Sequence, residues 1–286
     1  MLAGEALRQA GTPAEIVPIK TSGDRILDRP LADAGGKGLF TKELEEALLA
    51  DRIDIAVHSM KDIPAVLPRG LVIAAVLPRE DPADVLVTTA ASLAALPRGA
   101  RIGTSSVRRR AQLLRARPDL ACVLLRGNVE TRLARLDSGE MEAAVLARAG
   151  LKRLGLDERP YVVLSTDEWL PSLGQGAVGI EIRAEDARAL AAVHPLDDPS
   201  TSIALACERA FQAALDGSCR TPIAGLATFD GRRLSFRGEV IAPDGSGTAA
   251  AAFALDLYDD AKTQAARAGH AAGMALKPRA LPWLAL

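Results

Sequence analysis

Short strand-like segments alternate with helix-like segments over much of this chain of 286 residues. Apolar runs at 84–88, 121–125 and 143–146 are each followed by a stretch with helical spacing. This alternation predicts layers of parallel α/β structure, because a helix is the usual connection between neighbouring parallel strands. Ligands of such folds bind beyond the carboxyl ends of the strands, in the crevice between lobes.

The remaining segments complete a fold of class α/β. Further strands are predicted over 14–20, 53–57, 71–77 and 177–182. Helices are predicted over 41–50 (with Thr41 as N-cap), 106–116, 128–138, 147–154, 184–193 and 200–215. After residue 219 the pattern becomes an antiparallel meander over 223–229, 234–241 and 248–257, followed by a helix over 260–276. The predicted partition is two α/β lobes, 1–77 with 177–195 and then 82–172, plus a smaller α+β domain over 199–286.

Composition excludes several classes of protein. The three cysteines and three histidines have no paired spacing, which argues against a disulfide framework and against a metal site. No apolar stretch approaches the roughly 20 residues of a membrane span, and the N-terminus does not resemble a signal peptide. A cytoplasmic protein follows, and we expect no membrane partner.

Arginine is concentrated in one part of the chain. Between Arg98 and Arg132 there are nine arginines and only two acidic residues. They gather around Gly-Thr-Ser-Ser-Val-Arg-Arg-Arg at 103–110 and Arg-Gly-Asn-Val-Glu-Thr-Arg at 126–132. Glycine and hydroxyl residues at the start of a helix expose N–H groups to anions, and arginine adds planar forks that match carboxylate or phosphate. The sequence therefore predicts a small ligand with several negative groups, while Arg110 and Arg115 are expected on a solvated helix face.

Nucleic acid is a poorer match for this arginine cluster. Only 3% of the residues are aromatic and the isoelectric point is near 6.3, so stacking platforms and a strongly basic surface are both missing.

Two glycine-rich segments match known motifs only superficially. Gly-Gln-Gly-Ala-Val-Gly at 174–179 has the dinucleotide spacing, but no strand directly precedes it and a strand follows it. Gly-Gly-Lys-Gly at 35–38 lacks the first glycine and the Ser/Thr of a phosphate loop. We interpret it as a glycine-hinged loop over a site, with Lys37 and Phe40 reaching inward; a solvated loop is an equally good reading of the spacing.

One family accounts for several motifs that occur in a fixed order. His-Ser-Met-Lys-Asp at 58–62 alone is typical of a solvated strand end. It occurs with Gly-Gly-Lys-Gly-Leu-Phe (35–40), Gly-Thr-Ser-Ser-Val-Arg-Arg (103–109), Leu-Arg-Gly-Asn-Val-x-Thr-Arg (125–132), Gly-Gln-Gly-Ala-Val-Gly-Ile-Glu (174–181) and Gly-Ser-Cys-Arg-Thr-Pro (217–222). From about residue 15 to residue 257 the chain resembles the porphobilinogen deaminase (hydroxymethylbilane synthase) family.

The resemblance implies a fold and a cofactor. Family members have two lobes like those of periplasmic binding proteins, and a third domain that holds a covalent dipyrromethane on a loop cysteine. Cys219 matches that cysteine. Cys122, in a strand, and Cys207, on a helix, fit buried apolar residues.

The resemblance also implies a reaction: a monomeric transferase condenses four porphobilinogen molecules head to tail, losing ammonia, into hydroxymethylbilane for tetrapyrrole biosynthesis. Positive charge develops on pyrrole nitrogens, and Asp62 matches the catalytic aspartate that stabilises it. Each ring carries an acetate and a propionate, which explains the arginines. The matching cofactor-binding residues are Ser59, Lys61, Thr104, Ser105, Ser106, Arg108, Arg109, Arg126 and Gly127. The matching substrate-binding residues are Arg132, Arg153, Gln175, Lys37 and Phe40.

The N-terminus departs from the family pattern. Family members start with a strand and a Gly-Thr-Arg-x-Ser-x-Leu-Ala segment, whereas Met-Leu-Ala-Gly-Glu-Ala-Leu-Arg-Gln-Ala at 1–10 resembles only the end of the helix that follows. A strand, an arginine and a serine are therefore expected to be missing. The alternatives to an active transferase are a truncated, weakly active or inactive copy and a non-catalytic two-lobe module that binds anions.

Overall fold

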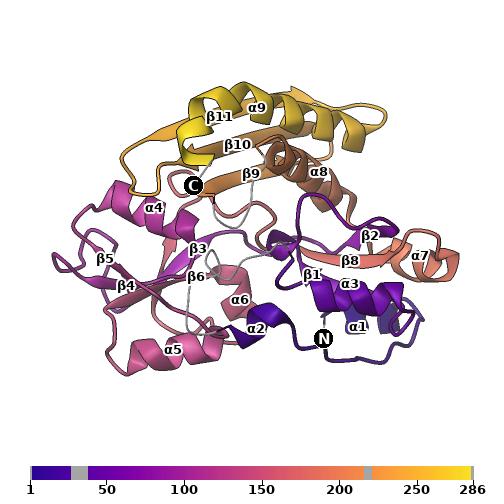
Figure 1. Cartoon of the computed structure of the whole chain (residues 1–286), viewed down its shortest axis with the longest axis horizontal. Helices are drawn as coiled ribbons and strands as arrows, with labels where there is room; N and C mark the ends of the chain where they lie inside the picture. Colours follow the sequence, from indigo (N-terminus) through magenta and orange to yellow (C-terminus); the bar gives the residue numbers. More distant parts are fainter. Residues whose placement is uncertain (1, 27–37, 216–220, 285–286) are drawn as a thin grey trace.

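The computed structural model describes residues 2–26, 38–215 and 221–284 of the chain (Figure 1). Three sheets, each with helices packed against it, make up the described part. The α/β class with a smaller α+β unit at the C-terminal end is confirmed.

The first sheet is antiparallel and has the strand order β1-β8-β2. Its strands are β1 (Ala56–Ser59), β2 (Leu71–Val76) and β8 (Val178–Arg183). Because side chains alternate along a strand, Ile180 and Ile182 of β8 face one side and pack against α1 (Leu2–Gln9) and α7 (Ala187–Val193). On the other side, Ala56 packs against Leu48 of α3 (Lys42–Leu49).

The second sheet has five strands in the order β5-β4-β6-β3-β7. Its strands are β3 (Asp84–Val87), β4 (Arg101–Gly103), β5 (Ala121–Val123), β6 (Ala143–Ala147) and β7 (Tyr161–Leu164). Its helices are α4 (Val107–Ala116), α5 (Val129–Asp137) and α6 (Arg148–Arg153). β4 runs parallel to β5 and β6, but β3 is antiparallel to β6 and β7.

The prediction of parallel layers is therefore wrong for the first sheet, where β8 is antiparallel to both neighbours, and for β3 in the second sheet. β3 enters the second sheet directly from the first, and β8 returns to the first sheet from the second. Neither strand arrives through a helical connection within its own sheet, so nothing turns the chain back into the parallel direction. β7 was not predicted from the sequence.

Two segments of the chain cross between the first and second sheets, and they lie side by side and are hydrogen-bonded to each other. The Leu77 N–H donates to Val178 O at 2.9 Å, and the Glu80 N–H donates to Gly176 O at 3.2 Å. Gly176 has φ of +87°, and a Cβ there would lie 2.2 Å from Glu80 O. This position therefore requires glycine for both its backbone conformation and its close contact.

The C-terminal unit is the predicted meander with two helices on one face (Figure 1). Its elements are α8 (Pro199–Ala214), β9 (Ile223–Phe229), β10 (Arg233–Ile241), β11 (Thr248–Asp256) and α9 (Ala261–Leu284). The β10 pairings are antiparallel and free of register shifts. Helices α8 and α9 approach closely, because a Cβ on Gly269 would lie 2.1 Å from Cys207 O.

One further expectation near the N-terminal end is wrong, and another is met only in its position. No strand forms over 14–20, where Ile16 and Val17 are 61% and 54% exposed and Pro18 removes a ladder donor. Thr41 occupies the N-cap position of α3, but its side chain makes no capping hydrogen bond. Two short 3-10 helices, η2 (Met60–Asp62) and η3 (His194–Leu196), and a short helix α2 (Ser22–Arg25) complete the described elements.

Candidate active site

Asp62 lies on the short turn η2, directly after strand β1. The turn is fixed by the second crossover: the Met60 N–H donates to Ala177 O at 3.1 Å. Gly174 lies underneath with φ of +74°, and a Cβ there would lie 2.8 Å from Met60 C and 2.9 Å from Lys61 N. The Gly-Gln-Gly-Ala segment thus supports the backbone of the turn that carries Asp62.

The charges around this turn come from both sheets. Burial raises the pKa of Asp62, while Lys61, Arg132, His58 and Arg109 oppose that rise. The side chain is nevertheless exposed by its accessible surface. Water therefore reaches a carboxylate on which cationic side chains from both sheets act.

Lys61 shares these surroundings. Burial lowers its pKa to about 8, Asp62 and Asp84 act in the opposite direction, and Arg109 and Arg108 lower it further. A lysine and an aspartate of the first sheet therefore lie close enough to arginines of the second sheet to change one another's ionisation.

Asp84, the first residue of β3, is the centre of a buried network. Its carboxylate accepts five hydrogen bonds: Arg108 Nη1 at 2.8 Å, Arg109 Nε at 3.1 Å and Nη2 at 2.6 Å, Trp169 Nε1 at 3.0 Å and Gln175 Nε2 at 2.8 Å. Burial alone would raise its pKa, but Arg108 and Arg109 hold it well below the usual range.

Sequence reasoning missed Asp84. The two arginines that were predicted to bind cofactor carboxylates therefore already hold a carboxylate of the protein. Gln175 lies at the crossover between the sheets, as predicted, and also donates to Pro82 O.

Arg126 lies just before helix α5, and Arg132 lies in its first turn. Arg126 is 6% exposed and donates to Gly23 O at 3.2 Å and Ile26 O at 2.9 Å, which ties it to the first part of the chain. Arg132 Nε donates to Gly127 O at 2.7 Å. Burial lowers the pKa of Arg132 to about 10, and Arg109 and Arg126 add to that effect. The guanidinium groups are thus crowded together, which is the condition that favours a bound anion.

The other predicted residues lie around this centre or outside it. Ser106 is the N-cap of α4, and Ser105 Oγ donates to Leu125 O at 2.5 Å. Thr104 Oγ1 accepts from the Ser106 N–H at 3.2 Å. Arg153 donates to Gly176 O at 2.5 Å, while Ser59 ends β1.

Of the three remaining predicted site residues, one is described by the structure and two are not. Phe40 is half-buried against Gly23, where a Cβ would lie 2.4 Å from the ring. Lys37 and Cys219 lie outside the described residues.

Comparison with known proteins gives this arrangement a context. The family model "Porphobilinogen deaminase, dipyromethane cofactor binding domain" matches residues 2–191, and "Porphobilinogen deaminase, C-terminal domain" matches residues 202–276. The chain belongs to the porphobilinogen deaminase family. A porphobilinogen deaminase from Nitrobacter winogradskyi is 52% identical over 93% of this chain and 83% of its own length. One from Paracoccus denitrificans is 54% identical over 82% of this chain and 76% of its own length.

Solved structures add little to this. The substrate binding protein of an amino acid ABC transporter matches 68% of this chain and 77% of its own length, with 17% identity and a TM-score of 0.35. The three sheets and family membership define the fold.

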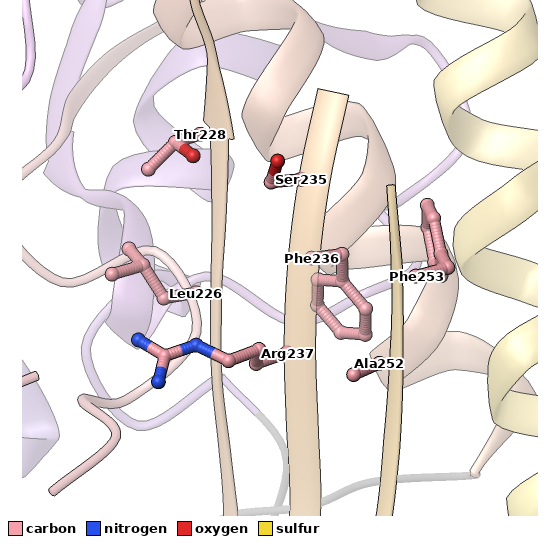
Figure 2. Close-up of a pocket in the computed structure, with 7 residues that line it drawn as sticks. All are labelled: Leu226, Thr228, Ser235, Phe236, Arg237, Ala252 and Phe253. Atoms are coloured by element: carbon pink, nitrogen blue, oxygen red, sulfur yellow. The ribbon is translucent and has the colours of Figure 1, made fainter. Parts of the chain in front are cut away.

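Two surface hollows of the described part of the chain lie along the C-terminal sheet, and Asp62 lines neither of them. The hollow drawn in Figure 2 has a volume of about 290 Å³ and lies on the C-terminal sheet among Leu226, Thr228, Ser235 and Arg237. Arg237 extends from β10 across β9 in Figure 2, and it already donates to Thr166 O and Asp167 O. Charged groups of both sheets converge instead at Asp62, which makes it the candidate site.

Two further observations bear on cofactors and membranes. Across 2–26, 38–215 and 221–284, no group of three or more His, Cys, Asp or Glu side chains is arranged to hold a metal ion. Within the same ranges, no helix combines the length and the apolar character that crossing a membrane demands.

One helix-face prediction is corrected and another is met. Arg115 was expected in solvent but is half-buried and pairs with Glu239 of the C-terminal sheet at 2.6 Å, because α4 packs against β10. Arg110 is exposed, as expected.

Cys207 is fully buried on α8, and Cys122 is half-buried in β5, as expected of apolar residues.

Proposed function

We propose that this chain is the transferase that joins four porphobilinogen molecules head to tail, with loss of ammonia, into the linear tetrapyrrole hydroxymethylbilane. The observation that carries the proposal is the accessible carboxylate of Asp62, which faces Arg109 and Arg132 of the other sheet. Family membership supports the same reaction. A module that only bound anions would gain nothing from a carboxylate here, because that carboxylate repels them.

Asp62 has the properties that the reaction needs. Positive charge develops on a pyrrole nitrogen when the substrate loses ammonia, and an ionised carboxylate fixed beside it lowers the energy of that state. Burial raises the pKa of Asp62 towards neutral pH, which favours transfer of the proton that the new ring loses.

The dipyrromethane cofactor fits the chemistry of the residues around Asp62. Its rings carry acetate and propionate groups, and the Nε atoms of Arg108 and Arg126 are buried donors without a partner in the described part of the chain. Lys61 adds a third cation beside Asp62. When bound, the cofactor supplies the ring to which the first substrate unit is joined.

The proposal assigns the remaining residues by family match. The cofactor-binding set is Ser59, Lys61, Thr104, Ser105, Ser106, Arg108, Arg109, Arg126 and Gly127, with covalent attachment at Cys219. The substrate-binding set is Arg132, Arg153, Gln175, Lys37 and Phe40. The proposed division into lobes 1–77 with 177–195, 82–172 and a cofactor domain over 199–286 assigns one sheet to each unit.

The test of the reaction uses Asp62→Asn, which keeps the shape of the side chain and removes its charge. Turnover of porphobilinogen should fall by a factor on the order of 10²–10³ or more. Asp137→Asn, at an exposed aspartate on α5, should retain parental turnover. Near-normal turnover of a folded Asp62→Asn protein would show that the proposed role is wrong.

The test of the attachment uses mass spectrometry. Cofactor-replete protein should gain the mass of two substrate units less two ammonias, and the gain should map to the peptide that contains Cys219. An adduct on Cys122 or Cys207 would contradict the assignment.

We also propose that the enzyme is monomeric and acts in the cytoplasm. Sedimentation at several concentrations should give the mass of a single chain. A stable dimer at micromolar concentration would contradict the first part of this proposal.

A further inference from the structure

A buried pair of ionisable side chains lies behind the turn that carries Asp62, and the reaction described above does not use it. His58 of β1 is 6% exposed and Glu181 of β8 is 1% exposed. His58 lies opposite Gly179 and Glu181 lies opposite Ala56, so the two side chains are diagonal neighbours on one face of the sheet. His58 Nε2 and Glu181 Oε2 are 3.0 Å apart.

The same carboxylate faces a second anchor of the turn. Arg209 of α8 donates through Nη2 to Pro64 O at 3.0 Å and to Ala65 O at 3.1 Å, just after Asp62. Burial lowers the pKa of Arg209, and the charge of Glu181 opposes that fall. His58 therefore holds the chain before the turn and Arg209 holds it after the turn, with Glu181 beside both.

This cluster is buried and only partly satisfied. Oε1 of Glu181 and Nη1 of Arg209 have no hydrogen-bond partner among the described residues. Glu45 of α3, 9% exposed, also faces the pair: burial raises its pKa, the charge of Glu181 adds to that rise, and His58 opposes it. Natural proteins keep buried polar groups of this kind at a cost in stability, so a functional reason is expected.

We propose that Glu181 and His58 are positioning residues for the reaction, which hold the turn at the end of β1 and set the charge that Asp62 experiences. The inference rests on the proposed function. The groups that face Asp62 are Lys61 of its own turn, His58 of β1, Arg109 of α4 and Arg132 of α5. Of these, His58 alone is held by a carboxylate of the same sheet.

The first experiment measures the pH dependence of kcat for the parent, His58→Gln and Glu181→Gln. His58 lowers the pKa of the Asp62 carboxyl, so its replacement should move the acid limb to higher pH in His58→Gln. We expect kcat at neutral pH to fall roughly tenfold with KM nearly unchanged. The double variant should resemble either single variant, because both remove one interaction.

Controls separate this role from simple stabilisation and from failure of the proposed function. His194→Gln, at an exposed histidine of η3, should leave the profile unmoved. A carbon-13 NMR titration of the Asp62 carboxyl, assigned with Asp62→Asn, gives the shift without turnover. If the parent is inactive but the Asp62 titration moves in His58→Gln, the proposed function fails and the positioning role stands.

An unmoved acid limb and an unmoved Asp62 titration in folded His58→Gln would overturn the inference. So would full additivity of the two substitutions in kcat. Should Glu181→Gln fail to fold, His58→Gln alone decides between these outcomes.

Discussion

Asp84→Asn is the substitution that most directly tests the buried network. The asparagine amide has almost the shape of the carboxylate but carries no charge. One acceptor oxygen is replaced by an NH₂ group, which is a donor. Every group that faces this carboxylate is a hydrogen-bond donor. Oδ1 accepts from Arg109 and Gln175, and Oδ2 accepts from Arg108 and Trp169. Whichever way the amide is placed, its NH₂ group therefore faces another donor, and two buried arginines lose their counter-charge.

The expected loss of stability follows from this geometry. Removing one partner of a buried ion pair costs about 3–5 kcal/mol, because the remaining charge stays desolvated. For a chain of this size a loss of 1 kcal/mol lowers Tm by roughly 2–4 °C, so the melting transition of the second sheet should fall by roughly 6–20 °C. Asp119→Asn is the matched control, since Asp119 pairs with Arg117 near the surface and should change Tm little.

The assay is thermal unfolding followed by far-UV circular dichroism, together with tryptophan emission, because Trp169 donates to Asp84. The pH dependence supplies a second check. A carboxyl whose pKa is depressed in the folded state contributes stability above its unfolded pKa of about 4 and loses that contribution as pH falls below it. The gap in Tm between parent and variant should be constant from pH 5 to 8 and narrow below about pH 4. A variant that melts within about 2 °C of the parent at pH 7 would have lost at most about 1 kcal/mol of stability, and that result would refute the reasoning.

Three further outcomes follow from the structure. Because burial lowers the pKa of Lys61 to about 8, its charge is lost as pH rises through that value, so kcat/KM should fall above about pH 8 and Lys61→Arg should remove this alkaline limb. Gly174→Ala should reduce kcat by at least tenfold because its Cβ meets the backbone of the catalytic turn, while Gly155→Ala, with φ of +66° and open space, measures the conformational strain alone. Gly269→Ala should destabilise the C-terminal unit by about 1–3 kcal/mol through contact with the facing helix, whereas Gly150→Ala, in a helix with room for a methyl group, should be neutral or stabilising; denaturant titration checks both.

The sequence predicted those parts of the fold that depend on local pattern. The meander over 223–257 and the helices near 106–116 and 128–138 have the predicted types and nearly the predicted bounds, because periodicity and capping residues decide them locally. Ser106 and Asn128 both act as N-caps through their side chains. Strand direction was not predictable in the same way, since β3 and β8 depend on where the chain crosses between sheets.

Long-range polar contacts could not be derived from the sequence. Asp84 opens an apolar strand, and no local pattern shows that it meets Arg108 and Arg109 more than twenty residues later. The same applies to Arg115, which looks solvated on a helical wheel but pairs with Glu239 across more than one hundred residues. A sequence shows which side chains carry charge, whereas packing decides which of those charges face one another.

The placement of the site follows from the two crossover segments. Asp62 lies at the end of a strand of the first sheet, and Arg109 lies at the start of a helix on the second. Gln175, on the second crossover, is bound to the same carboxylate as Arg109. A change in the angle between the sheets about these segments would therefore move the arginines relative to Asp62 and alter the charge around it. The proposed function adds two carboxylates with every ring. If the arginines that act on Asp62 also bind the growing chain, as proposed, the charge around Asp62 should change with each ring that is added.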